Sequence, residues 1–235
     1  MVINGGLIRK EDLAGYEVNL YQPIKTTYRG NQIFTMGAPS GGGIVILTAL
    51  NVLECFQLSQ LTPNSARTYH LIAEAMKFAH HNRSKYVGDP SFSEIPYSML
   101  LSKKLACEKA REINFKKSST PKQTVKTGNK INDSYKESKD TTHYSIVDKE
   151  GNAVSVTYTL GYSFGSGVTI PGTGILTNNQ MNNFAHNYGI TDSYFRSSSP
   201  ANKLEPLKRP MSTMAPVMVF DLSLIHISEP TRPRL

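Results

Sequence analysis

The sequence predicts a layered α/β fold with a mostly antiparallel sheet. Apolar residues recur with a helical period through much of the stretch from 43 to 113. From Thr141 onward they alternate with the period of a β-strand instead. Helices thus come mainly first and strands mainly second, and such segregation favours a layered α/β arrangement. The chain of 235 residues is long enough for one domain or two small ones.

The first half is expected to be mainly helical, with a small β-unit near its start. Gly30-Asn31 is a turn signal between two strand-like runs, the second of which covers residues 32–36. Asn64 or Ser65 is expected to cap a helix that runs from Ala66 to about Tyr86. The other elements expected here are helices at 10–13, 43–56 and 98–113, extended chain at 16–20 and a turn at Gly88-Asp89-Pro90.

A run of glycines, Gly41-Gly42-Gly43, precedes the helix expected at 43–56. Backbone N–H groups at a helix start can bind an anion. Glycines there also allow the helix start to pack closely against other segments. No Gly-Lys-Ser/Thr follows, so the run is not a P-loop. The sequence leaves ligand contact and tight packing equally open.

The second half is expected to be rich in β-structure. Residues 142–147 and 153–159 alternate as two strands, and Asp148–Asn152 is a turn between them, which together predict a hairpin. After it, the sequence predicts a glycine-rich loop at 161–174, extended chain at 174–179, mostly loop at 182–209 and a strand at 211–220.

Thr141 stands at the junction between a lysine-rich segment and this hairpin. If the bond between Asp140 and Thr141 is cut, the threonine hydroxyl becomes a nucleophile with a free α-amine beside it. An α-amine titrates near ~8, so it can accept a proton at physiological pH. Taken alone, a threonine before a strand is more often an ordinary loop residue. The blocks of sequence that follow Thr141 favour the catalytic interpretation.

These blocks stand in a fixed order: Thr141–Ser145, Asp148–Ser155, Thr157–Leu160, Phe164–Gly167, Gly174–Leu176, Asn178–Met181 and Lys208–Ser212. In them, the chain resembles the γ-glutamyltransferases, also called glutathione hydrolases, from about Gly5 to Asp221. The resemblance implies an N-terminal nucleophile hydrolase with a four-layer αββα sandwich, here expected to be truncated at both ends. It also implies self-cleavage of one precursor into two subunits. Residues 1–140 would be the C-terminal part of the large subunit, and residues 141–221 the N-terminal part of the small subunit.

The resemblance assigns roles to single residues. Thr141 would attack its own preceding carbonyl and, after cleavage, the γ-carbonyl of glutathione or another γ-glutamyl compound. Water, an amino acid or a dipeptide would then accept the γ-glutamyl group from Thr141. Thr159 would hydrogen-bond the nucleophile, although its position also suits an ordinary β-branched strand residue. The substrate-binding positions are Gln180 for the α-amine, Ser212 and Thr213 for the α-carboxylate, and Tyr194 on a lid loop at 187–199.

Two positions depart from the family pattern. Gly161 occupies a site where relatives have Asn or Glu, and Asn183 replaces an Asp that pairs with the substrate ammonium. A hydrogen bond to a charged group typically contributes about 1.5–3 kcal/mol. We therefore expect weaker glutamyl binding or a different acyl donor.

Other functions stay open. The first alternative to a γ-glutamyltransferase is a related threonine-nucleophile acylase with another acyl donor, to which Gly161 and Asn183 give some weight. An uncleaved, non-catalytic binding or scaffold protein is a further alternative. The net charge of +8 suggests a nucleic-acid module, but residues 103–140 hold 11 Lys and Arg against 5 Asp and Glu. That segment has few apolar residues after Phe115, so residues 116–140 are interpreted as a solvated linker. We expect no nucleic-acid partner.

No cofactor and no metal site are expected. His70 and Glu74 have the i, i+4 spacing of a helical ligand pair, but no third ligand joins them on that face. The two cysteines do not make a disulfide framework, and Cys55 is expected to be a core residue of a helix. Met1–Gly6 does not have the pattern of a secretory signal, and no apolar run is long enough to span a membrane. By resemblance, the protein is expected to be periplasmic, secreted or at the cell surface.

Both ends of the chain are expected to be incomplete. The block from Gly5 to Tyr16 belongs well inside the longer family chain, while residues 222–235 have no family counterpart and resemble a translated sequencing-library adapter. In the family, an arginine that binds the α-carboxylate lies upstream of Met1. A glycine pair of the oxyanion hole lies downstream of Asp221, and losing one oxyanion donor can cost ~10²–10³ in rate. The 235-residue chain is therefore expected to be inactive by itself.

Overall fold

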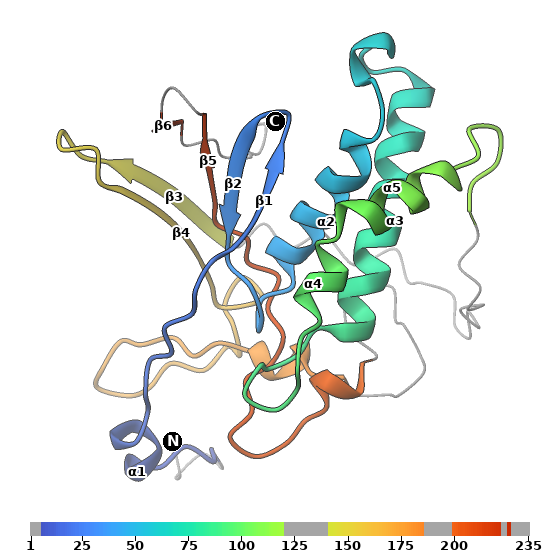
Figure 1. Ribbon diagram of the computed structural model, residues 1–235. Coiled ribbons are helices and arrows are strands. Elements are labelled where there is room, and N and C mark those ends of the chain that lie inside the picture. The colour runs from blue at the N-terminus through green and yellow to red at the C-terminus, as the bar shows by residue number, and fades with distance from the viewer. Residues whose placement is uncertain (1–5, 120–140, 186–198, 222–224, 227–235) are drawn as a thin grey trace.

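The computed structural model describes residues 6–119, 141–185, 199–221 and 225–226 (Figure 1). These residues form a layer of helices, a four-stranded sheet and a separate two-stranded hairpin. The helices are α1 (Lys10–Ala14), α2 (Gly42–Glu54), α3 (Ala66–Tyr86), α4 (Tyr97–Leu100) and α5 (Lys103–Arg111), with 3₁₀ turns η2 (Leu58–Gln60), η3 (Gln180–Asn183) and η4 (Pro200–Asn202). The strands are β1 (Ile24–Tyr28), β2 (Asn31–Thr35), β3 (Thr141–Val147), β4 (Ala153–Thr159), β5 (Val217–Phe220) and β6 (Ile225–His226).

The four-stranded sheet is antiparallel and has the order β1-β2-β5-β6. β1 and β2 form the hairpin that the Gly30-Asn31 signal predicts. β2 pairs with β5, a strand from the far end of the chain, so that Thr35 lies opposite Val217 and Ile33 opposite Val219. The sheet therefore joins residues that precede Thr141 to residues that follow it.

One face of this sheet is covered by the helices. Leu47 of α2 packs with Ile33 and Val217 in a buried cluster between helix and sheet. A second cluster holds the helices together and consists mainly of small residues, which lets α2, α3 and α5 approach closely: Val45, Ala49, Val52, Ala75, Ala79, Ala106 and Ala110. The predicted helix from Ala66 to Tyr86 is confirmed, and Ser65 is its cap, because the Ser65 hydroxyl accepts a hydrogen bond from Thr68 N–H at 3.2 Å.

The hairpin β3–β4 lies on the other side of the sheet. Ser155 of β4 lines a cavity together with Phe34 and Met218, whose side chains alternate with the helix-facing ones of their strands. The described residues thus form layers in the order helix, sheet, sheet (Figure 1). Among the described helices, none has the length and apolar character needed to cross a bilayer.

Two sequence predictions were wrong in their extent. The single helix expected at 98–113 is two helices, because Ser102 is extended and its hydroxyl caps α5 through Leu105 N–H at 3.2 Å. The strand expected at 211–220 is regular only from Val217, after Pro216, whose nitrogen carries no hydrogen to donate. The preceding segment makes a single parallel bridge at Ser212 instead.

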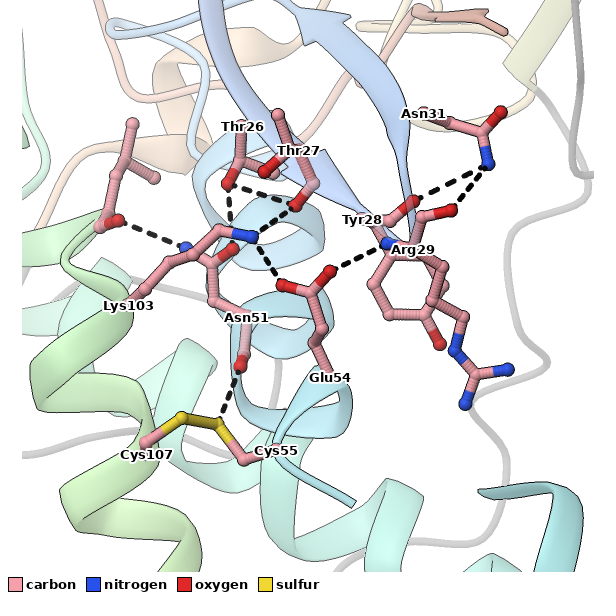
Figure 2. Close-up of polar contacts among 11 residues, drawn as sticks. Thr26, Thr27, Tyr28, Arg29, Asn31, Asn51, Glu54, Cys55, Lys103 and Cys107 are labelled. Carbon is pink, nitrogen blue, oxygen red and sulfur yellow. Dashed lines mark hydrogen bonds and ion pairs between the residues drawn. A yellow bond between two sulfur atoms is a disulfide. The ribbon is translucent and has the colours of Figure 1, made fainter. Parts of the chain in front are cut away.

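The expectation that Cys55 is a core residue of a helix holds in part, because Cys55 packs against the buried cluster of small residues, but its disulfide was not predicted. Cys55, at the end of α2, is half-buried and forms a disulfide with Cys107 of α5 (Figure 2). The close packing of α2 on α5 brings together two cysteines that are 52 residues apart.

Polar contacts strengthen the same junction (Figure 2). Lys103 forms an ion pair with Glu54 and donates to the carbonyl of Thr27 at 2.8 Å. The Asn51 amide donates to the Leu101 carbonyl at 3.0 Å. These contacts and the disulfide fix α5 and β1 to the end of α2.

Candidate active site

Thr141 and Thr159 lie opposite each other in the hairpin β3–β4. Thr141 Oγ1 donates a hydrogen bond to Thr159 Oγ1 at 3.2 Å. Thr159 Oγ1 also accepts from the N–H of Gly161 at 3.0 Å. Thr141 is exposed and Thr159 is half-buried, so the pair presents one accessible hydroxyl and a second that is fixed by the backbone. Alternation and turn residues predicted the hairpin, which is confirmed.

The end of β4 is bound to the segment that precedes Gln180. Asn179 N–H donates to the Leu160 carbonyl at 2.9 Å, and Asn179 Oδ1 accepts from Tyr162 N–H at 3.1 Å. Gly161 has φ +99°, and a Cβ built on it would overlap with Asn179 Oδ1. The positive φ of Gly161 favours glycine, because residues with a side chain rarely adopt it, and a side chain here would also displace Asn179 Oδ1.

Gln180 and Asn183 lie together in η3. The Asn183 side-chain amide donates to Gln180 Oε1, and Gln180 Nε2 lies 3.6 Å from where a Cβ of Gly161 would stand. Both side chains are half-buried and uncharged. This part of the site offers amide groups and no carboxylate among the described residues.

Ser212 and Thr213 pack against the loop that leads into α2. Ser212 N–H donates to the Pro39 carbonyl at 3.0 Å, and the Ser212 carbonyl accepts from Gly41 N–H at 2.8 Å. A Cβ on Gly42 would overlap with the Thr213 carbonyl. Of the two interpretations of the glycine run, the structure therefore favours tight packing. Ser212 is half-buried and Thr213 is exposed.

Asn202, which sequence reasoning missed, joins two of these segments. Its side chain contacts the backbone of Asn183 and of Met211, which precedes Ser212. A single Asn in a loop carries no motif that would have identified it. Hydrogen bonds thus join the end of β4 to the segment before Gln180, and Asn202 joins Asn183 to the residue before Ser212. Asp140 and Tyr194 lie outside the described residues.

A cavity of about 800 Å³ lies elsewhere, between the sheet and the hairpin. Its lining is mainly apolar and includes Phe34, Met218 and Phe220. None of the predicted site residues lines it. The cavity therefore belongs to the space between the sheets, and the predicted site lies in the loops at the end of the hairpin.

The side chains considered as a metal pair have other partners. His70 Nε2 contacts the Asn114 carbonyl at 3.0 Å. Burial raises the pKa of Glu74, but hydrogen bonds from Lys77, Ser119 and Ser118 outweigh it and lower the pKa to about 2. In the part of the chain that the structure describes, no group of three or more His, Cys, Asp or Glu is arranged to hold a metal ion.

Comparisons with known proteins place this geometry in a family. The family model of gamma-glutamyltranspeptidase matches residues 1–227. The glutathione hydrolase proenzyme of Escherichia coli (strain K12) is 44% identical over 216 residues, which cover 92% of this chain and 37% of that protein. An acylase, the ACY 1 proenzyme of Pseudomonas sp. (strain SE83), is 37% identical over 220 residues, which cover 94% of this chain and 36% of that protein.

The fold has a solved counterpart. The crystal structure of cephalosporin acylase from Bacillus halodurans superposes with a TM-score of 0.72 at 30% identity, over 95% of this chain and 37% of that one. This likeness confirms the predicted fold class, the N-terminal nucleophile hydrolase sandwich. The chain spans little more than a third of the length of these relatives. From the match over nearly its whole length, the chain belongs to the γ-glutamyltranspeptidase family.

Proposed function

We propose that the protein of which this chain is a part is a γ-glutamyltransferase and glutathione hydrolase whose nucleophile is Thr141. The observation that supports this most directly is the pair of hydroxyls at the end of the hairpin, 3.2 Å apart. Thr141 is the accessible member of the pair and the first residue of β3. A cut before it would leave its α-amine free beside the hydroxyl, which is the arrangement that threonine nucleophiles need.

The first reaction is self-cleavage. Thr141 Oγ1 attacks the carbonyl carbon of Asp140, the C–N bond to Thr141 breaks, and the nitrogen takes up a proton to become an amine. Water then hydrolyses the resulting ester, which frees the Asp140 carboxylate and restores the Thr141 hydroxyl. The products are a large and a small subunit derived from one precursor.

The second reaction is γ-glutamyl transfer. The freed α-amine takes the proton from the Thr141 hydroxyl, whose oxygen attacks the γ-carbonyl of the substrate. The resulting α-ammonium gives that proton to the substrate nitrogen as its C–N bond breaks, so the substrate nitrogen leaves as an amine. Thr159 can donate its own hydrogen to the Thr141 oxygen as that oxygen loses its proton, because a hydroxyl both accepts and donates. Water or the amine of an amino acid or dipeptide then takes the γ-glutamyl group from the ester.

We propose that the glutamyl end lies between the two loop segments joined to the hairpin. Gln180 and Asn183 would accept hydrogen bonds from the α-ammonium, and Ser212 and Thr213 would donate to the α-carboxylate. Tyr194, on the segment outside the described residues, would cover the bound substrate.

A second candidate is an acylase with the same nucleophile and another acyl donor. Asn183 carries no charge, and Gly161 offers no side chain where the family pattern has a polar one. The similar proteins include acylases, among them the ACY 1 proenzyme and the cephalosporin acylase. Rates with a γ-glutamyl anilide and with acyl anilides that lack the α-ammonium would distinguish the two candidates.

The remaining expectations are also proposals. The disulfide between Cys55 and Cys107 supports a periplasmic, secreted or cell-surface location, because disulfides persist in oxidising compartments. We propose that the 235-residue chain alone does not turn over substrate, since it spans about 37% of its relatives. Hydrolysis of a γ-glutamyl anilide by the isolated chain would contradict this.

The decisive experiment compares three versions of the longer protein on a denaturing gel. Wild type should separate into two chains, the smaller of which begins Thr-Thr-His-Tyr on N-terminal sequencing. Thr141→Ala should stay intact. Thr142→Ala is the matched control, because Thr142 is exposed and its side chain alternates to the other face of the hairpin, so it should cleave like wild type. Wild type that remains whole would overturn the proposal and favour a non-catalytic scaffold.

A further inference from the structure

We propose that Asn202 is a positioning residue for recognition of the glutamyl end of the substrate. Its side-chain amide holds the Gln180–Asn183 turn and the Ser212 segment at a fixed separation. The inference rests on the proposed function and deepens it, because those two segments are the ones proposed to hold the ammonium and the carboxylate.

The backbone N–H, the backbone carbonyl, Nδ2 and Oδ1 of Asn202 each make a hydrogen bond. Nδ2 donates to the Asn183 carbonyl at 2.7 Å, and Oδ1 accepts from Met211 N–H at 2.9 Å. The Asn202 carbonyl accepts from Ala185 N–H at 2.9 Å, and its own N–H donates to the Ser199 carbonyl at 3.0 Å. The residue is 0% exposed, so water cannot replace these partners.

The position requires a neutral group with one donor and one acceptor. The Asn183 carbonyl can only accept, and the Met211 N–H can only donate. A carboxylate has no donor and would face the Asn183 carbonyl with two acceptor oxygens. Loss of a hydrogen-bond partner lowers the stability more for a buried polar group than for a surface one, because water cannot take the place of the lost partner.

Asn202 is itself fixed to the helical layer. The Ser199 hydroxyl donates to the Lys85 carbonyl near the end of α3 at 2.8 Å and accepts from Ala201 N–H at 3.0 Å. A Cβ on Gly88 would overlap with the Ala201 carbonyl, so η4 lies directly on the chain that leaves α3. Asn202 therefore connects both site segments to the end of α3, in addition to the backbone hydrogen bonds that each segment makes with other elements.

Further along, the buried carboxylate of Asp89 accepts from Arg209 N–H at 2.7 Å, two residues before Met211. This second contact ties the Ser212 segment to the same region. The Asp89 contact holds only the Ser212 segment, whereas Asn202 contacts both the Gln180–Asn183 turn and the residue before Ser212.

The nucleophile pair is positioned by other means. Thr141 and Thr159 are held by the β3–β4 ladder and by the Gly161 N–H, and neither touches Asn202. A change at Asn202 should therefore weaken substrate binding more than it slows the chemical step, and it should leave self-cleavage in place.

The test uses the longer protein and steady-state hydrolysis of a γ-glutamyl anilide. Asn202→Asp should cleave itself like wild type and should show a KM raised by about tenfold with kcat changed by less than about threefold. A tenfold change corresponds to about 1.4 kcal/mol, within the cost of one unsatisfied buried group. The matched control is Asn114→Asp, since Asn114 is exposed and its side chain serves as an acceptor for Lys116 N–H, a role that Asp keeps. It should match wild type in KM and kcat.

A second variant covers the case in which Asn202→Asp does not fold. Ser199→Ala keeps the Asn202 amide but removes its anchor on α3, and it should raise KM by about threefold with kcat retained. An unchanged KM in the folded Asn202→Asp variant, or in Ser199→Ala if only that variant folds, overturns the inference. So does a loss confined to kcat. An uncleaved or inactive wild type would instead count against the proposed function, so the two failures can be told apart.

Discussion

Breaking the disulfide between Cys55 and Cys107 should destabilise the helical layer. The bond joins the end of α2 to α5, next to the cluster of small residues that packs these helices together. Without it, the unfolded chain gains the freedom of a large open loop, while the native contacts are almost unchanged.

The size of this effect follows from the chain length between the cysteines. They are 52 residues apart, and loop-closure entropy for a ring of that length gives roughly 4 kcal/mol at 25 °C. With a urea dependence of about 3 kcal/mol per molar, the unfolding midpoint should fall by about 1.3 M. Removal of native disulfides from small secreted domains typically costs about 2–5 kcal/mol, which brackets this value.

The assay is equilibrium urea unfolding of the purified protein with and without a thiol reductant. A double variant, Cys55→Ala with Cys107→Ala, should reproduce the midpoint of the reduced protein and should not respond to the reductant. Two free thiols titrated in the unfolded, unreduced protein would refute the reasoning, as would equal midpoints in all samples.

Three further outcomes follow from single residues. Asn183→Asp places a negative charge where we propose that the substrate ammonium binds, and it should lower KM for a γ-glutamyl anilide by about fivefold, because a hydrogen bond to a charged group contributes about 1 kcal/mol more than a neutral one; an unchanged KM would count against the proposed contact. Gly161 has φ +99°, which alanine rarely adopts, and an alanine Cβ there would overlap with Asn179 Oδ1. Gly161→Ala should therefore lower the free energy of unfolding by about 1 kcal/mol or more, as measured in urea titrations. Glu74→Gln should lower the thermal midpoint above pH 4.5. Because the folded pKa of Glu74 is depressed from 4.5 to about 2, that difference should shrink as the pH falls between these values, and a constant difference would contradict it.

Local sequence signals predicted the elements that depend on local physics. The alternation after Thr141 and the turn around Gly151 predicted the hairpin, and Asn64 or Ser65 was expected to cap α3, which Ser65 does. These features depend on residues a few positions apart, which is why they can be predicted without knowing the rest of the fold.

Features that depend on distant partners could not be predicted in the same way. The Cys55–Cys107 bond exists because two helices pack together, and nothing in the spacing of the cysteines shows it. Ser212 lies in a loop because Pro39 and Gly41 bind its backbone, although its neighbours alternate like a strand. Ser102 is a missed local signal, since a serine before a helical run is a common cap.

The pairing of β2 with β5 has a consequence for the cleavage that we propose before Thr141. Thr35 and Val217 are neighbours in one sheet, yet they lie on opposite sides of the bond before Thr141. Both cysteines precede that bond, so no covalent link spans the nick among the described residues. If the proposed cleavage takes place, the β2–β5 ladder and the shared buried cluster would hold the two products together, and native mass measurement should find a single particle where a denaturing gel finds two bands.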